Sequence, residues 1–164
     1  MVALKHFIVS LFFVIFLICN LALAQEPFRS CNGDWGVFMG QTDGSKFCYV
    51  AAKSNENKDY LVLQYVETGV VRSVLVSEYG FLEDENVFLD LLGNKYHLLK
   101  ISEFFATRDF YVTGNVIEDM MRANEMLIVK GSGTTLLKED KFSLFGFKES
   151  LSEMIKFCEQ EITA

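Results

Sequence analysis

The sequence has little proline and little histidine: its 164 residues include one Pro and two His. The single proline, Pro27, lies near the N-terminus, so the later turns depend on Gly, Asn and Asp, which suits tight connections between short strands. One histidine, His97, lies outside the first 24 residues, in the segment KYHLLK. A lone histidine among strand-forming apolar residues is more often structural than a general base, and it cannot build a zinc cluster.

Motifs for catalysis and for nucleotide binding are also missing. The chain has no nucleophile elbow, no Walker loop and no Rossmann glycine run. The glycine-rich stretch GSGTT, residues 131–135, lacks the lysine and the following helix of a phosphate loop, so we interpret it as a hairpin. The acidic runs at 83–85 and 139–140 lack the alternating spacing of a calcium loop, and we interpret them as solvated turns. We expect no catalytic site, metal site or cofactor, and therefore no enzyme.

Long apolar runs are absent except at the N-terminus. Residues 1–24 combine a basic start at Lys5, an apolar run from Phe7 to Cys19, and a small-x-small pattern at Ala22 and Ala24 before Gln25. This pattern predicts a secretory signal peptide cleaved after Ala24, with an uncleaved anchor as the alternative. After cleavage we expect no stable membrane span, because about 20 apolar residues are needed to cross a bilayer.

An excess of positive charge is missing too. The formal net charge of the chain is −7 at pH 7. A negative chain is repelled by nucleic acid and by anionic membrane surfaces, so we do not expect either as the main partner.

Alternating apolar and polar residues predict a meander of about eight short strands. Eight predicted strands cover residues 35–40, 46–52, 60–66, 70–77, 86–92, 95–99, 125–131 and 141–145, and residues 104–108 are a candidate for a further strand. Gly93-Asn94 is the expected two-residue turn between two of them, since both residues tolerate positive φ. The chain after the signal then divides into an N-terminal tail, 25–34, and a single domain, 35–164.

Two segments change to the helical period. In NVIEDMMRAN, the apolar residues Val116, Ile117, Met120 and Met121 share one side of a short helix. In GFKESLSEMIKFCEQE, Phe147, Leu151, Met154, Ile155 and Cys158 form one apolar stripe, so the chain should end in an amphipathic helix laid on the sheet. We predict a mainly β fold: an antiparallel β-sandwich or partly closed barrel with one short helix and a C-terminal helix.

The aromatic residues offer one candidate surface. Phe104-Phe105 and Phe110-Tyr111 are consecutive pairs, and both members of such a pair cannot point inward from one strand. An exposed aromatic patch is one interpretation, while core filling accounts for most of the other aromatic side chains.

The cysteines leave two pairings open. Export would place Cys31, Cys48 and Cys158 in an oxidising compartment, which suggests one bridge and one remaining thiol. A bond between Cys48 and Cys158 would close a loop of about 110 residues and stabilise the fold by roughly 4 kcal/mol. A bond between Cys31 and Cys48 would close a small loop instead. The residues favour the long pairing, with Cys31 then a free thiol able to form a mixed disulfide or a dimer.

Several segments together resemble a known family. They are GDWGVFMGQTDGSKFCYVAAK, VLVSEYGFLEDENVFLDLLGNKYHLL, RDFYVTGNVIEDMMRANEMLIVKGSG and DKFSLFGFKESLSEMIKFC. From Trp35 to Cys158 the chain resembles the invasion-associated locus B family of alphaproteobacterial exported proteins. The resemblance implies a small β-rich envelope protein without a known enzymatic activity. It also implies that Cys48 and Cys158 are the paired cysteines.

The sequence leaves three functions open. The first is a non-catalytic envelope or secreted protein, located in the periplasm, at the cell surface or outside the cell. Such a protein would bind a protein partner of the host or of the envelope, in connection with virulence. The second is a structural or stress-protective periplasmic protein without a host role. The third, a hydrolase, would need His97 in a cleft beside a hydroxyl and a carboxylate.

Overall fold

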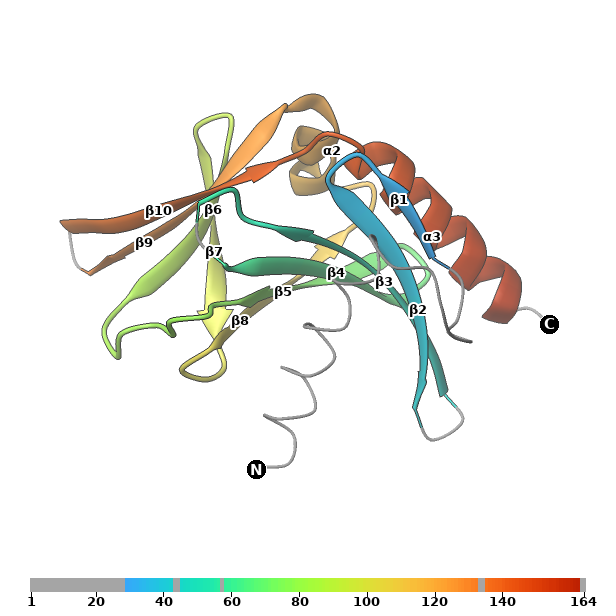
Figure 1. Cartoon of the computed structure of the whole chain (residues 1–164), viewed down its shortest axis with the longest axis horizontal. Coiled ribbons are helices and arrows are strands. Elements are labelled where there is room, and N and C mark those ends of the chain that lie inside the picture. Colours follow the sequence, from blue (N-terminus) through green and yellow to red (C-terminus); the bar gives the residue numbers. More distant parts are fainter. Residues whose placement is uncertain (1–28, 43–44, 57, 133–134, 163–164) are drawn as a thin grey trace.

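A computed structural model of the chain describes residues 29–42, 45–56, 58–132 and 135–162. The predicted signal peptide with Ala22 and Ala24, and also Gln25, lie outside the described residues. In the described part, ten strands and two helices follow one another (Figure 1). The strands are β1 (Arg29–Asn32), β2 (Trp35–Thr42), β3 (Ser45–Lys53), β4 (Tyr60–Glu67), β5 (Val70–Val76), β6 (Asn86–Leu91), β7 (Asn94–Lys100), β8 (Phe105–Tyr111), β9 (Glu125–Ser132) and β10 (Thr135–Ser143). The helices are α2 (Asn115–Arg122) and α3 (Phe147–Ile162).

The strands form one antiparallel sheet in the order β1-β2-β3-β4-β5-β8-β7-β6-β9-β10. The sheet curls into a half-barrel, so that β10 returns to the connection after β3 (Figure 1). There the Asn55 backbone N–H donates a hydrogen bond of 2.9 Å to the Lys141 carbonyl. The predicted mainly β class, with a partly closed barrel and a C-terminal helix, is confirmed.

The core lies inside the curl because side chains alternate along each strand. In β3, Cys48, Val50 and Ala52 face the main apolar cluster, which also receives residues of both helices. The alternate residues Tyr49 and Ala51 face outward, into a small second cluster with Phe38 and Val62.

Both predicted helices are present. In α2, Val116, Ile117 and Met120 are buried, and Met121 remains 37% exposed. In α3, the stripe of Phe147, Leu151, Met154 and Cys158 is buried against the sheet. The helix lies beside β1, β2 and β3, along the end of the sheet opposite to β9 and β10 (Figure 1).

The structure differs from the prediction at the N-terminal tail. Arg29–Asn32, which we placed in the tail before the domain, form the edge strand β1 paired with β2. Their sequence, RSCN, has no apolar alternation, so the strand depends on pairing rather than on burial of its own side chains.

The turn between β6 and β7 is shifted by one residue from the predicted one. The two turn residues are Leu92 and Gly93, with φ of 53° and 85°, and Asn94 already pairs with Leu91. The Gly93 N–H donates to the Asp90 carboxylate at 3.2 Å, which fixes this register. A leucine with positive φ is unusual, and the sequence pattern therefore pointed to Gly93-Asn94 instead.

Candidate functional site between the two helices

Helix α3 is fixed to the sheet by covalent and aromatic contacts. The Cys48–Cys158 disulfide joins β3 to the last turns of the helix, with 6.1 Å between the Cα atoms. At the start of the helix, Phe147 meets Trp35 edge to face, with 4.8 Å between the ring centroids. The Trp35 indole N–H donates to the Ser143 carbonyl at 2.9 Å. Both ends of the helix are therefore tied to the early strands.

Polar contacts hold the other side of α3 against β1. The Ser30 hydroxyl and the Asn32 amide both donate to the Glu153 carboxylate, at 2.6 and 3.0 Å. β1 therefore covers one side of the helix, while the side facing α2 is open.

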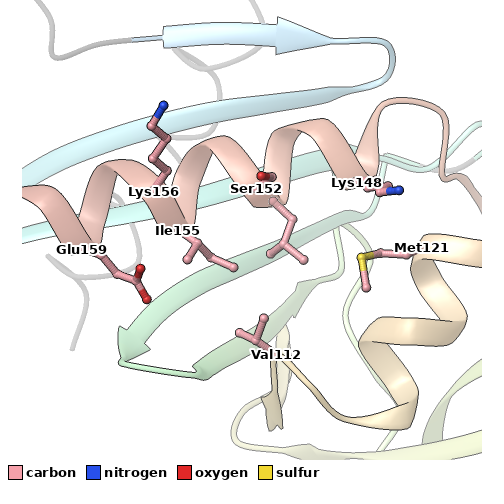
Figure 2. A pocket seen from close by; sticks show the side chains of 8 residues that line it. Val112, Met121, Lys148, Ser152, Ile155, Lys156 and Glu159 are labelled. Carbon is pink, nitrogen blue, oxygen red and sulfur yellow. The ribbon is translucent and has the colours of Figure 1, made fainter.

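A groove runs along this open side, between α3 and the segment formed by α2 and the end of β8. It encloses about 580 Å³. Figure 2 shows Met121 of α2 and Ile155 of α3 pointing into the space between the helices, with Val112, next to β8, at its floor. Leu151 completes the apolar lining. An open apolar groove at a junction of helices is a common kind of binding site.

Polar side chains lie around this lining. Lys148 is near α2 and Glu159 is toward the C-terminal end of α3, while Lys156 points away from the groove (Figure 2). The site thus has an apolar centre with separated charges of opposite sign along its length.

A second, polar hollow lies at the other face of α2. There the Asp119 carboxylate accepts hydrogen bonds from the Tyr96 hydroxyl at 3.2 Å and from the Asn94 amide at 3.3 Å. The Arg122 guanidinium donates to the same carboxylate at 2.8 Å. Burial and the neighbouring Asp119 raise the pKa of Tyr96 above its usual value. The Asp119 carboxylate thus receives hydrogen bonds from all three neighbours. We therefore interpret this hollow as a structural contact between α2 and the β6–β7 turn.

His97 lines a third hollow, on the outer face of β7 and β8, of about 540 Å³. Thr107 and Asp109 line it too, but each is engaged elsewhere. The Thr107 hydroxyl donates to the Ser73 carbonyl at 2.6 Å, and Asp109 accepts two hydrogen bonds from Arg72, at 2.7 and 3.1 Å. Among the described residues no hydrogen bond joins the His97 imidazole to either of them. His97 stacks at a tilt on Phe88, with 5.2 Å between the ring centroids.

The cysteine predictions have two outcomes. The favoured long pairing, Cys48 with Cys158, is present in the structure. In the structure of the whole chain Cys31 is disulfide-bonded, to a partner outside the described residues. The free thiol and the dimer through Cys31 were predicted for the chain after cleavage behind Ala24, and for that chain they stay predictions.

The consecutive aromatic residues do not form one exposed patch. Phe110 is 5% exposed and belongs to the core, whereas its neighbour Tyr111 is 72% exposed. Phe104 and Phe105 are half-buried. Exposed apolar side chains are instead scattered over loops and strand ends, including Tyr79, Leu82, Leu92 and Phe145.

The acidic runs that we interpreted as solvated turns are partly buried. Asp140 lies within β10 and is fully buried, and Glu85 is 6% exposed and accepts the Leu82 N–H at 3.1 Å. The expectation fails because it considered only the run of charges, and not the inward face on which Asp140 lies with Phe142. Asp140 belongs to a buried ionic cluster, described below, that sequence reasoning missed.

Two features are absent from the residues that the structure describes. No group of three or more His, Cys, Asp or Glu side chains is arranged to hold a metal ion. No helix in these residues combines the length and the apolar character needed to cross a bilayer.

The fold is thus that of a small β-rich half-barrel whose C-terminal helix is fixed by a disulfide. Neither a protein-family model nor a curated protein sequence matches the chain. Among solved structures, it is similar to invasion associated protein B from Bartonella henselae, with a TM-score of 0.65 and 15% sequence identity. The match covers 82% of this chain and 99% of the Bartonella chain. At this identity the likeness establishes a common fold.

Proposed function

We propose that this chain is an exported, non-catalytic protein that binds a protein partner in the groove between α2 and α3. The observation that carries the proposal is the groove on the side of α3 that faces α2, where Met121, Ile155 and Val112 give an apolar lining above the buried Leu151. Protein interfaces depend on a few apolar anchors that fill such pockets, with a polar rim around them.

Export is supported by two separate features. The N-terminal pattern ending at Ala24 predicts a cleaved signal peptide. The Cys48–Cys158 bond favours an oxidising compartment, since disulfides rarely persist in a reducing cytosol. The protein would then act in the periplasm, at the cell surface or outside the cell.

The kind of partner follows from the groove and from the likeness to the Bartonella protein. An apolar side chain of the partner would enter beside Met121, with an acidic group near Lys148. The Bartonella protein is described as invasion associated, which supports a host or envelope protein as the partner.

Charge placed in the groove tests this proposal. Met121→Lys puts an ammonium group among apolar side chains, at the C-terminal turn of α2, where a positive charge does not harm the helix. We expect at least a tenfold loss of partner retention in affinity capture from host-cell and envelope extracts, since a disturbed anchor costs about 2 kcal/mol or more. Leu82→Lys is the matched control, because Leu82 is 60% exposed and lies outside the groove. Equal retention by both variants and the wild type would overturn the groove as the binding site.

A further inference from the structure

Three charged side chains from distant parts of the chain meet inside the half-barrel. Lys130 of β9 is 2% exposed, and Asp59, just before β4, and Asp140 of β10 are fully buried. The Lys130 Nζ atom contacts Asp59 Oδ2 directly and lies 3.1 Å from Asp140 Oδ2. One amine is therefore held against two carboxyl groups in a site closed to water.

Each carboxyl group has a different set of neighbours. Asp59 Oδ1 accepts the Glu78 backbone N–H at 3.1 Å and lies 3.2 Å from the Ser77 hydroxyl. Asp140 has the Lys138 ammonium group 3.9 Å away, at the edge of the cluster. The Phe81 ring lies beside Lys130, with 5.2 Å from Nζ to the ring centroid, and closes the site on that side.

The two carboxyl groups divide their protons unequally. Burial would raise the pKa of Asp59, but hydrogen bonds from Asp140 and Lys130 outweigh it, and the pKa falls below its usual value. Burial and the hydrogen bond with Asp59 raise the pKa of Asp140. Of the two carboxyl groups, Asp140 is therefore the one that binds a proton more readily.

We propose that Lys130 and Asp59 become joined by an intramolecular isopeptide bond, with Asp140 as the proton-transfer residue. The site has the three parts that this reaction needs: an amine nucleophile, a carboxyl group whose oxygen is in contact with it, and a second acid beside that carboxyl group.

The reaction balances without a further reactant. A proton passes from the Lys130 ammonium group to the carboxyl pair, and the free amine lone pair attacks Cγ of Asp59. Negative charge then develops on Oδ1, where the Glu78 N–H and the Ser77 hydroxyl can stabilise it as an oxyanion hole does. The attacking nitrogen gives up its second proton through Asp140, so that Oδ2 receives two protons in all, the Cγ–Oδ2 bond breaks, and one water molecule leaves. An ammonium and a carboxylate are converted to an amide and water, with no change in redox state.

The fixed placement of the two side chains explains why they could react here without a separate enzyme. Groups held in a reactive geometry gain effective concentrations of about 10⁵–10⁸ M over free reactants. The buried site also excludes the bulk water that drives amides back toward hydrolysis. Ordinary surface pairs, such as Lys141 and Glu125 at 3.2 Å, have neither the burial nor the second acid.

The bond would close the half-barrel. It would link the connection between β3 and β4 to β9 across 71 residues, where the curl of the sheet brings β10 back to the connection after β3. The disulfide fixes α3 to β3, so the two cross-links would act on different parts of the fold. The amide, unlike the disulfide, would survive a reducing environment.

Mass spectrometry of the reduced, denatured full chain tests the proposal. We expect the intact mass to be lower than the sequence mass by one water molecule. Proteolysis should release one branched peptide pair that contains both Asp59 and Lys130. An intact mass without this loss would overturn the proposal, and so would a loss located in a single linear peptide, as in a cyclic imide.

Variants separate the three roles. The Lys130→Arg variant should keep its full sequence mass, because it lacks the amine that forms the bond. The exposed control, Lys141→Arg, should be lighter than its sequence mass by one water molecule, as the wild type is. Asp59→Asn should lose ammonia instead and reach the same final mass as the linked wild type. Asp140→Asn should slow the linkage by about 10²–10⁴-fold, the usual effect of removing a general acid. Circular dichroism confirms that each variant is folded, and a folded Asp140→Asn that links at the wild-type rate would exclude the assigned role of Asp140.

Discussion

Cys158, in the C-terminal helix, is bonded to Cys48, in the third strand, across 110 residues of sequence. The bond lies at the far end of α3 from the Trp35–Phe147 ring contact, so the helix is held at two separated points. Because α3 forms one wall of the groove, this attachment also fixes the shape of the proposed binding site.

Removing the disulfide should lower stability substantially. We expect the Cys48→Ser, Cys158→Ser double variant to lose about 4 kcal/mol of unfolding free energy, since the bond constrains a long loop of the unfolded chain. Urea unfolding can be followed by the fluorescence of Trp35, which is the only tryptophan and is fully buried. An unchanged unfolding midpoint would show that the bond does not stabilise the native fold.

Gly146 should tolerate no side chain. Its φ is +83°, and a Cβ atom there would lie 1.8 Å from the Asn32 carbonyl oxygen. We expect Gly146→Ala to cost at least ~3 kcal/mol, because it adds a backbone clash to an unfavourable conformation. Gly69→Ala is the control: Gly69 has φ of +79° but nothing within 4 Å of the added atom, so only ~1–2 kcal/mol is expected. Equal losses measured by urea unfolding would contradict the close approach at Asn32.

The buried cluster should depend on its lysine. Lys130→Met leaves two buried carboxyl groups without this partner and also prevents the proposed bond to Asp59, so it should cost at least about 3–5 kcal/mol. Lys141→Met removes an exposed partner of Glu125, 43% exposed in its side chain, and should cost at most about 1 kcal/mol. Thermal and urea unfolding of the two variants compare the sites directly. A mild effect at Lys130 would mean that the cluster is hydrated or rearranged.

Asp109 should titrate below its usual range. The hydrogen bonds from Arg72 lower the pKa of this carboxyl group from the ordinary 3.8, burial opposes them, and the charge of Arg72 adds a smaller lowering. Because the folded-state pKa is the lower one, the pair stabilises the fold above pH 3.8, and this contribution disappears as the pH falls through the folded-state value. Both side chains are almost half exposed, so solvent screening limits the contribution to about 1 kcal/mol or less.

An NMR titration of the Asp109 carboxyl carbon checks this prediction. In Arg72→Gln the midpoint should rise toward the ordinary value, and in the wild type high salt should reduce the shift. An identical midpoint in the variant would assign the low pKa to another cause.

Both helices and most strands could be predicted from the spacing of apolar residues. Their inward-facing residues repeat at the helical period in the helices and alternate in the strands. This spacing could not locate β1, whose polar residues Arg29–Asn32 are held by β2 and by Glu153 of α3. The β6–β7 turn was missed by one residue, since a leucine takes a left-handed conformation that sequence rules assign to glycine or asparagine.

The buried cluster was missed for a different reason. Asp140 follows Glu139 and precedes Lys141, so the charges alone suggested solvent. Its alternation with the buried Phe142, and that of Lys130 with Met126 and Ile128, did contain a signal that both lie on the inner face. Their meeting with Asp59 depends on the curl of the sheet, which the sequence pattern does not specify. The groove likewise depends on how α2 and α3 are placed.

Site-specific photo-crosslinking tests the proposed function most directly. A photoreactive amino acid would replace Met121 in one variant and Leu82 in another, each exported by its native cell and exposed to the envelope and to host cells. Our account predicts one defined adduct from position 121, absent from position 82 and reduced by excess unlabelled wild-type protein. Identical adducts from both positions, or none from position 121 in exported, folded protein, would contradict a binding site in the groove.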